Sequence, residues 1–222
     1  METITVFYSR CHRISSLRIK LLIVKDVSAE KCNQVIELIR RKQQEVLVVL
    51  CGGLHECHYI YTMPGNIVGI NYIGDDIYEI KALKNRNGYI PGRWIKLGKI
   101  CIGGLDALNH KQNLERLVKN ILLDCDAYLV ISAYPPKESR CSSIEILGKK
   151  LSIGIENLLE ELRSVLNDSI LIVISCHRAI ESFCIDRHDN VMHVSLSKEP
   201  LIELDVIIEN NEVNIHKYSV KY

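Results

Sequence analysis

Short apolar runs alternate with amphipathic segments along most of the chain. Residues 18–24 form an apolar run bounded by charged residues, which predicts a buried strand. Residues 29–43 place apolar side chains at helical spacing with charges opposite them, and residues 46–50 form a second apolar run. Strand, helix and strand within about 30 residues predict a βαβ unit, with a right-handed crossover and a parallel strand pair.

The alternation continues to residue 175 and then gives way to strands alone. Helices are expected at residues 71–83, 112–123 and 153–166, strands at 59–63, 127–132 and 170–175, and a hairpin at 93–102. Four short strands follow, at residues 182–186, 191–195, 201–209 and 212–218. A mixed sheet covered by helices and finished by a β-meander predicts a layered α/β sandwich. We expect one domain over residues 18–222, preceded by an N-terminal extension or edge strand at residues 1–17.

Composition and charge are those of an ordinary globular protein. The chain has 222 residues, 47% apolar and 25% charged, and 28 Lys and Arg against 27 Asp and Glu give a formal net charge of +1. A dedicated nucleic-acid-binding or membrane-binding protein usually has a basic excess, so this balance argues against both classes. No apolar run approaches the roughly 20 residues that a membrane-spanning helix needs. We therefore expect a soluble cytoplasmic protein.

The cysteines favour the same compartment. The nine cysteines include no C-x-x-C pair, their number is odd, and no secretory apolar region precedes them. This pattern disfavours a disulfide framework, so we expect free and mostly buried thiols in a reducing cytoplasm.

Candidate chemistry is expected where the strands end. In open α/β sheets, binding sites lie just beyond the carboxyl ends of the strands. The expected strand ends read Lys25-Asp26-Val27-Ser28, Cys51-Gly52-Gly53-Leu54, Pro64-Gly65-Asn66-Ile67-Val68, Ser132-Ala133-Tyr134-Pro135-Pro136 and Ser175-Cys176-His177-Arg178-Ala179.

In this order, the strand ends resemble those of the calcineurin-like metallophosphoesterases. That family carries Asp-x-His, Gly-Asp, Gly-Asn-His, a lone His often followed by Pro-Pro, and Gly-His-x-His at successive strand ends. The matching pieces, over about residues 18–218, are Asp26, Gly52, Pro64-Gly65-Asn66, Gly103-Gly104-Leu105-Asp106, Pro135-Pro136 and His177. The resemblance implies a four-layer α/β/β/α sandwich, and a two-metal centre that activates a water and clamps a phosphate.

Most of the metal positions that the resemblance implies hold other residues. Ser28, Gly53, Ala133 and Ala179 replace ligands, and Gly53 replaces the one that bridges both metals. Two divalent cations a few ångströms apart repel strongly without an anionic bridge, so no dinuclear centre is expected.

Three ligand positions keep the family's residue. Asp26, Asn66 and His177 leave at most one weakly bound divalent metal, Mn or Zn. Ile67 replaces the histidine that would protonate the leaving group, and losing such an acid typically costs about 10²–10⁴-fold in rate.

The retained residues also have purely structural explanations. Asp26 or Ser28 can cap the helix that begins near Ala29, and Asn66 follows a glycine in a turn, where Asn is favoured. His177 can be a hydrogen-bonded, partly buried histidine.

Other polar residues form weaker candidates. Lys25, Arg93 and Arg178 could form an anion-binding pocket without metal. The cluster His55-Glu56-Cys57-His58 has the wrong spacing for a zinc site and predicts a solvated turn. The adjacency of Cys176 and His177 suggests a nucleophile and its base, but neighbouring residues on a strand point to opposite faces.

Three functions follow, of which the first is favoured. The chain is a catalytically impaired binding or scaffold module whose partner is another protein. Alternatively, it is a metal-dependent phosphoesterase with an altered or mononuclear site, in which Cys51 or Cys176 supplies a thiolate that suits zinc. A third reading is a metal-free sensor of phosphate or a nucleotide.

Overall fold

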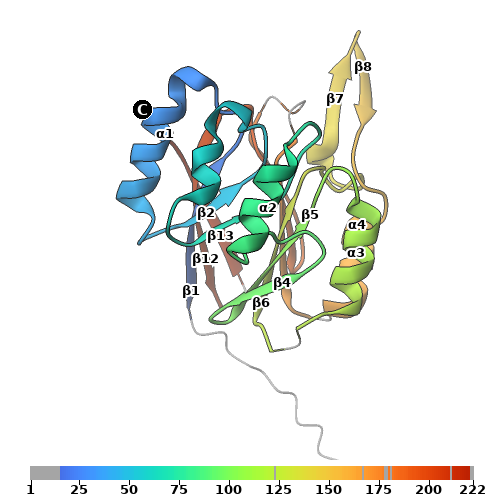
Figure 1. Ribbon diagram of the computed structural model, residues 1–222. Coiled ribbons are helices and arrows are strands. Elements are labelled where there is room, and N and C mark those ends of the chain that lie inside the picture. The colour runs from blue at the N-terminus through green and yellow to red at the C-terminus, as the bar shows by residue number, and fades with distance from the viewer. Residues whose placement is uncertain are drawn as a thin grey trace, which may run out of the picture.

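Two β-sheets pack face to face, and helices cover the outer face of each (Figure 1). This computed structural model describes residues 16–122, 124–166, 168–177, 180, 182–210 and 212–220. The four layers confirm the α/β/β/α sandwich. Most of the segment expected as an N-terminal extension, and residues Arg178 and Ala179, lie outside the described residues.

The first sheet has five strands. In spatial order they are β13 (Glu212–Ser219), β12 (Leu201–Glu209), β1 (Leu17–Val24), β2 (Leu47–Leu50) and β3 (Ile67–Gly69). Strands β1, β2 and β3 run parallel, and β12 pairs antiparallel with β1 and β13. The expected βαβ unit is therefore confirmed.

The second sheet has six strands. In spatial order they are β10 (Cys184–His188), β11 (Val191–Ser195), β9 (Ile170–Ser175), β6 (Ala127–Ser132), β5 (Ile100–Leu105) and β4 (Trp94–Leu97). Strands β5, β6, β9 and β11 run parallel, with β4 and β10 antiparallel at the two edges. The four C-terminal strands are all present and form two hairpins, one in each sheet.

Four α-helices and two short 3₁₀ helices lie in the described part of the chain. They are α1 (Ala29–Lys42), η1 (His55–Thr62), α2 (Ile77–Asn85), α3 (His110–Lys119), η2 (Arg140–Ser142) and α4 (Leu158–Leu166). Apolar residues of α1, η1 and α2 pack on the first sheet, and those of α3 and α4 pack on the second. No helix in the described part of the chain is long and apolar enough to cross a membrane.

Alternation of side chains along each strand builds three apolar layers. Leu21 and Ile23 of β1 point between the two sheets, whereas Leu22 and Val24 point toward α1. Because parallel strands covered on both faces need apolar residues at every position, they appear in the sequence as continuous apolar runs.

The segment expected as a strand at residues 59–63 is helical instead. Residues 55–62 form the 3₁₀ helix η1, and Ile60 and Tyr61 are buried against the first sheet. The expectation was wrong because a short apolar run has the same appearance in a buried strand and in a buried turn of helix. The helix expected from residue 71 begins only at Ile77, where Asp76 and Glu79 form a capping box.

A hairpin that the sequence pattern did not reveal stands apart from both sheets. Strands β7 (Ser143–Ile146) and β8 (Lys149–Ser152) pair only with each other among the described residues, and they project from the body of the molecule (Figure 1). Leu147 and Gly148 form the turn, both with positive φ, which is typical of two-residue hairpin turns.

Eight of the nine cysteines lie within the described residues, and all eight are paired. The disulfides are Cys32–Cys57, Cys51–Cys176, Cys101–Cys125 and Cys141–Cys184. The expectation of free thiols is therefore wrong, because the fold brings together cysteines that are 24 to 125 residues apart. Disulfides are typical of oxidising compartments and of intracellular hyperthermophile proteins, so the cysteines no longer argue for the cytoplasm, and that location stays a prediction.

We expect the eight paired cysteines to resist alkylation until the protein is reduced. Denatured protein treated with iodoacetamide should keep these cysteines unmodified, and the same treatment after reduction should modify them all. Peptide mapping by mass spectrometry reads out both samples. Full alkylation without reductant, in protein purified without reductant, would contradict the pairing.

Candidate functional site

The carboxyl ends of the strands of both sheets meet at one edge of the sandwich. We call this the carboxyl edge and define it by Lys25 after β1, Cys51 after β2, Asn71 after β3, Asp106 after β5, and Tyr134 and His177 after β6 and β9. The Cys51–Cys176 disulfide and the bond from the Ala107 N–H to the Asn71 carbonyl connect the two sheets here.

Asn66 and Ile67 are not at the carboxyl edge. Ile67 pairs with Val48 and Gly69 with Leu50 in the parallel register of β2 and β3, so both residues lie at the amino end of β3. The placement predicted from the sequence is wrong, because the Pro64-Gly65-Asn66 turn precedes the strand instead of following it. Asn71 and Tyr72 follow β3, so Tyr72 takes the place of the histidine that the resemblance implies.

Asn71 is held in a buried hydrogen-bond network. The Tyr89 hydroxyl lies 2.9 Å from Asn71 Oδ1 and 3.2 Å from Asp106 Oδ2. The other Asp106 oxygen accepts the backbone N–H groups of Leu108 and Asn109, at 3.1 and 2.6 Å. Burial and the Asp106 charge raise the pKa of Tyr89, so the phenol stays protonated and can donate. Asn71 and Asp106 therefore fasten the loops that cross the edge.

Lys25 is a buried lysine at the carboxyl edge. The Lys25 side chain, directly before Asp26, is only 1% exposed. His177 is half-buried, and first its burial and then the charge of Lys25 lower the pKa of its imidazole. The Lys25 charge therefore disfavours a second positive charge on His177.

Asp26, one of the predicted metal ligands, is exposed at the carboxyl edge. It has a φ of 50°, and its backbone N–H donates to the Gly52 carbonyl at 3.2 Å. Ser28 occupies the N-cap position of α1 without a side-chain capping bond, and Glu56 of η1 accepts the Ala29 N–H at 2.8 Å instead. The predicted capping role of Asp26 or Ser28 is therefore taken by Glu56.

Asp75 is a carboxylate at this edge that the sequence pattern did not single out. Its side-chain oxygens accept the backbone N–H groups of Gly53, at 2.9 Å, and of Tyr72. Gly52 has a φ of +81°, and a Cβ there would come within 2.5 Å of Asp75 Oδ2 and 2.6 Å of Tyr72 Cβ. Gly52 therefore makes room for the Asp75 loop, and this glycine is the signal in the sequence that could have indicated a close approach of the loop.

The Cys51–Cys176 disulfide joins the ends of β2 and β9 with a Cα–Cα distance of 6.1 Å, and both cysteines are buried. Beside it, the Tyr134 ring lies 6.3 Å from that of Tyr72 and 5.4 Å from that of His177, between ring centroids. Ala133, at the position of the lone histidine, is fully buried. Covalent and aromatic contacts therefore occupy much of the carboxyl edge.

The predicted trio of Asp26, Asn66 and His177 is not brought together, because Asn66 lies at the opposite end of the sheet. Among the residues that the structure describes, no group of three His, Cys, Asp or Glu side chains could hold a metal ion. Arg93, proposed with Lys25 for anion binding, is exposed just before β4 at the far edge of the second sheet, and Arg178 is outside the described residues. The anion pocket stays a prediction.

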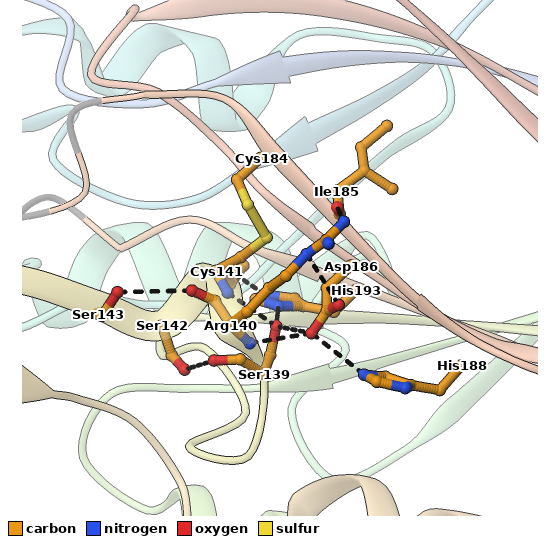
Figure 2. Close-up of a disulfide and its surroundings, with 11 residues drawn as sticks. Ser139, Arg140, Cys141, Ser142, Ser143, Cys184, Ile185, Asp186, His188 and His193 are labelled. Carbon is orange, nitrogen blue, oxygen red and sulfur yellow. Dashed lines mark hydrogen bonds and ion pairs between the residues drawn. A yellow bond between two sulfur atoms is a disulfide. The ribbon is translucent and has the colours of Figure 1, made fainter.

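A second polar cluster lies in the interior, beside the Cys141–Cys184 disulfide (Figure 2). His193 Nδ1 is 2.6 Å from Ser139 Oγ and its Nε2 is 2.9 Å from Ser175 Oγ. Ser139 Oγ also donates to Asp186 at 2.9 Å. In a Ser-His-Asp triad the carboxylate binds the imidazole, whereas here both ring nitrogens bind serines, and His193 is 1% exposed. The cluster is therefore structural.

Comparison with known proteins identifies the fold. No protein-family model matches the chain, and neither does any curated protein sequence. Similar solved structures include a putative 5′-nucleotidase from Staphylococcus aureus, at 14% identity and a TM-score of 0.51, over 92% of this chain and 54% of that one. A purple acid phosphatase from yellow lupin, Lupinus luteus, has 8% identity and a TM-score of 0.50, over 92% of this chain and 52% of that one.

The chain spans about half the length of these two structures. It has the fold of the calcineurin-like metallophosphoesterases, as the strand ends led us to expect.

Replacing Tyr89 with Phe tests the network at the carboxyl edge. The Tyr89→Phe variant leaves Asn71 Oδ1 and Asp106 Oδ2 without the hydroxyl that they share, and we expect a loss of about 1–3 kcal/mol in the free energy of unfolding. Urea denaturation measures the loss. Tyr59→Phe, at an exposed tyrosine, is the matched control and should change little. Equal effects of the two substitutions would contradict the assigned role.

Because of His193, the free energy of unfolding should decrease as the pH drops below about 6.5. Burial lowers the pKa of His193 to about 4, from about 6.5 in the unfolded chain. The unfolded state binds more protons between these values, so the contribution of neutral His193 is complete above pH 6.5 and declines toward pH 4. We expect a loss of about 2 kcal/mol between pH 7 and 4.5 in urea unfolding. His193→Gln should show a clearly smaller loss over this interval, and an identical pH dependence would be evidence against this assignment.

Proposed function

We propose that this protein is a catalytically impaired binding module that uses the phosphoesterase fold as a scaffold for another protein. The observation that carries the proposal is the content of the carboxyl edge, where Gly53, Tyr72 and Ala133 stand at positions for which the resemblance implies metal ligands or the general acid. Three features of that edge support the proposal. They concern the bridging anion, the binding of metal ions and the general acid that two-metal hydrolysis requires.

The bridging anion is missing. Gly53 stands where the resemblance implies the bridging aspartate, and its backbone N–H donates to Asp75. The two Asp75 oxygens each accept a backbone N–H group, from Gly53 and Tyr72, so this carboxylate is already used in holding a loop. Without a bridge, the repulsion between two adjacent divalent cations is not offset.

The charge of Lys25 and the Cys51–Cys176 disulfide also disfavour metal binding at the carboxyl edge. Buried Lys25 already supplies a positive charge next to His177. Cys51 and Cys176, the residues that could have become zinc-binding thiolates, are joined to each other. A disulfide has no thiolate to offer a metal, so the oxidised protein lacks these ligands.

The group that would protonate the leaving group is also absent. Tyr72 replaces the expected histidine, is buried, and packs beside Tyr134. The loss of general-acid catalysis typically lowers a rate by about 10²–10⁴-fold. A fold kept without its acid, its bridge and most of its ligands is better suited to binding than to hydrolysis.

A hydrolysis assay with a matched control separates this proposal from its alternatives. Oxidised protein is assayed on bis(p-nitrophenyl) phosphate and p-nitrophenyl phosphate with Mn²⁺ or Zn²⁺. We expect no metal-dependent turnover above that of an Asp26→Ala variant. Asp168→Ala, which removes an exposed carboxylate just before β9 at the opposite end of the sheet, is the control for net charge.

Turnover that Asp26→Ala abolishes and Asp168→Ala preserves would establish the altered-site phosphoesterase instead. The third candidate, a metal-free phosphate or nucleotide sensor, is checked by thermal shift, because a ligand raises stability by RT ln(1 + [L]/Kd). Stabilisation by nucleotides without metal would favour that candidate.

A further inference from the structure

The hairpin of β7 and β8 is held out from the body of the protein (Figure 1). Every β8 residue is exposed, Leu147 at the turn is 98% exposed, and Leu151 is also exposed. A two-stranded hairpin is at best marginally stable in water by itself, so this one depends on its attachment.

On the β7 side, the hairpin is attached by a disulfide, hydrogen bonds and an ion pair (Figure 2). The Cys141–Cys184 disulfide ties the helical turn η2, directly before β7, to strand β10. Buried Asp186 of β10 accepts the Ser139 hydroxyl and the Arg140 N–H, each at 2.9 Å, and pairs with the Arg140 guanidinium at 3.1 Å. The Arg140 side chain also donates to the Ile185 carbonyl at 2.8 Å.

The β8 side is fastened as well. The Ile153 N–H donates to the Ser142 carbonyl at 2.8 Å, and the Ser152 hydroxyl donates to the Lys137 carbonyl at 2.9 Å. Further along, the Lys137 N–H donates to the Ile155 carbonyl at 2.9 Å. Both legs of the hairpin are thus fixed at the base, which sets the direction in which it projects.

The exposed strand β8 offers backbone groups and charge for pairing. Within the described residues β8 has only β7 as a neighbour, so its outer edge has unpaired N–H and carbonyl groups. Lys149 and Lys150 lie on this strand, with Glu145 opposite Lys150 and Ile146 opposite Lys149. The edge is therefore basic, with an exposed leucine two residues beyond Lys149.

The charges decide which kind of strand can pair here. A second copy of β8 would bring lysines against lysines, and like charges across a strand pair are destabilising. An acidic strand removes that repulsion and gains ion pairs. Lys149 and Leu151 share one face of β8, because side chains alternate along a strand, so a complementary strand carries an acidic and an apolar residue two positions apart.

We propose that the β7–β8 hairpin is the docking element of this protein, and that an extended segment of a partner protein, with acidic residues alternating with apolar ones, adds to the edge of β8. The proposal rests on the proposed function as a binding module and names its surface. In this binding mode, backbone hydrogen bonds supply the affinity, and the side chains of Lys149, Lys150 and Leu151 determine the specificity for the partner.

Synthetic peptides test the docking element directly. The probe is a fluorescein-labelled peptide of alternating Glu and Leu with serine ends, and its counterpart has Lys in place of Glu. Fluorescence anisotropy with the full-length oxidised protein should show binding of the Glu peptide only. A Lys149→Glu/Lys150→Glu variant should weaken binding by about tenfold or more. Both lysines are exposed and neither takes part in the bonds at the base, so the variant should fold.

An Arg40→Glu/Arg41→Glu variant is the matched control. It makes the same change in net charge on the exposed C-terminal turn of α1 and should bind the peptide as the unmodified protein does. Equal loss in both variants would mean non-specific charge attraction and overturn the proposal. So would the absence of Glu-peptide binding at about millimolar protein.

A lipid surface is the competing partner, because an exposed leucine beside two lysines also suits anionic headgroups. Co-sedimentation with vesicles of phosphatidylserine and phosphatidylcholine examines it. Vesicle binding that depends on Lys149 and Lys150, without peptide binding, would overturn the proposal in favour of a membrane. The hydrolysis assay gives its result independently, so failure of the hairpin proposal is distinguishable from failure of the proposed function.

Discussion

The packing of the two sheets against each other is the constraint on which the rest of the structure depends. Inner-face residues such as Leu21 and Ile23 of β1, Leu129 of β6 and Ile172 of β9 are buried between the sheets. Burial of apolar surface contributes roughly 25 cal/mol per Å², so this shared layer is a dominant stabilising contribution. The parallel strands of both packed sheets end at a common edge, where a binding site would normally form.

What the chain places at that edge differs from what its fold would lead one to expect. Tyr89 fastens Asn71 to Asp106, and Asp75 holds the loop after β3 to the end of β2. A disulfide crosses between the sheets, and Lys25 leaves a buried positive charge. These contacts stabilise the edge, whereas a two-metal centre would need carboxylates and imidazoles left free to bind cations. The same edge can therefore be rigid and chemically quiet, and the proposed partner would bind at another surface.

Much of the sandwich could be predicted, because buried parallel strands such as β6 and β9 are continuous apolar runs. Strand β3 could not, since it has three residues, and a turn such as Pro64-Gly65-Asn66 marks a strand's beginning as readily as its end. Because of that ambiguity, the sequence pattern predicts the candidate site at Asn66 and Ile67, whereas Asn71 and Tyr72 are the residues that follow β3. The β7–β8 hairpin buries little and left no apolar run to detect. The cysteine pairs were hidden because a separation such as 125 residues carries no information about contact in space.

The central claim is that protein groups have replaced metal ions at the carboxyl edge. Anomalous X-ray diffraction from crystals of the oxidised protein soaked in Mn²⁺ examines it at the atoms concerned. We expect no manganese peak beside Asp26, Asp75 and His177. A strong manganese peak coordinated by these side chains would contradict the claim and restore a metal-dependent reaction as the function of the edge.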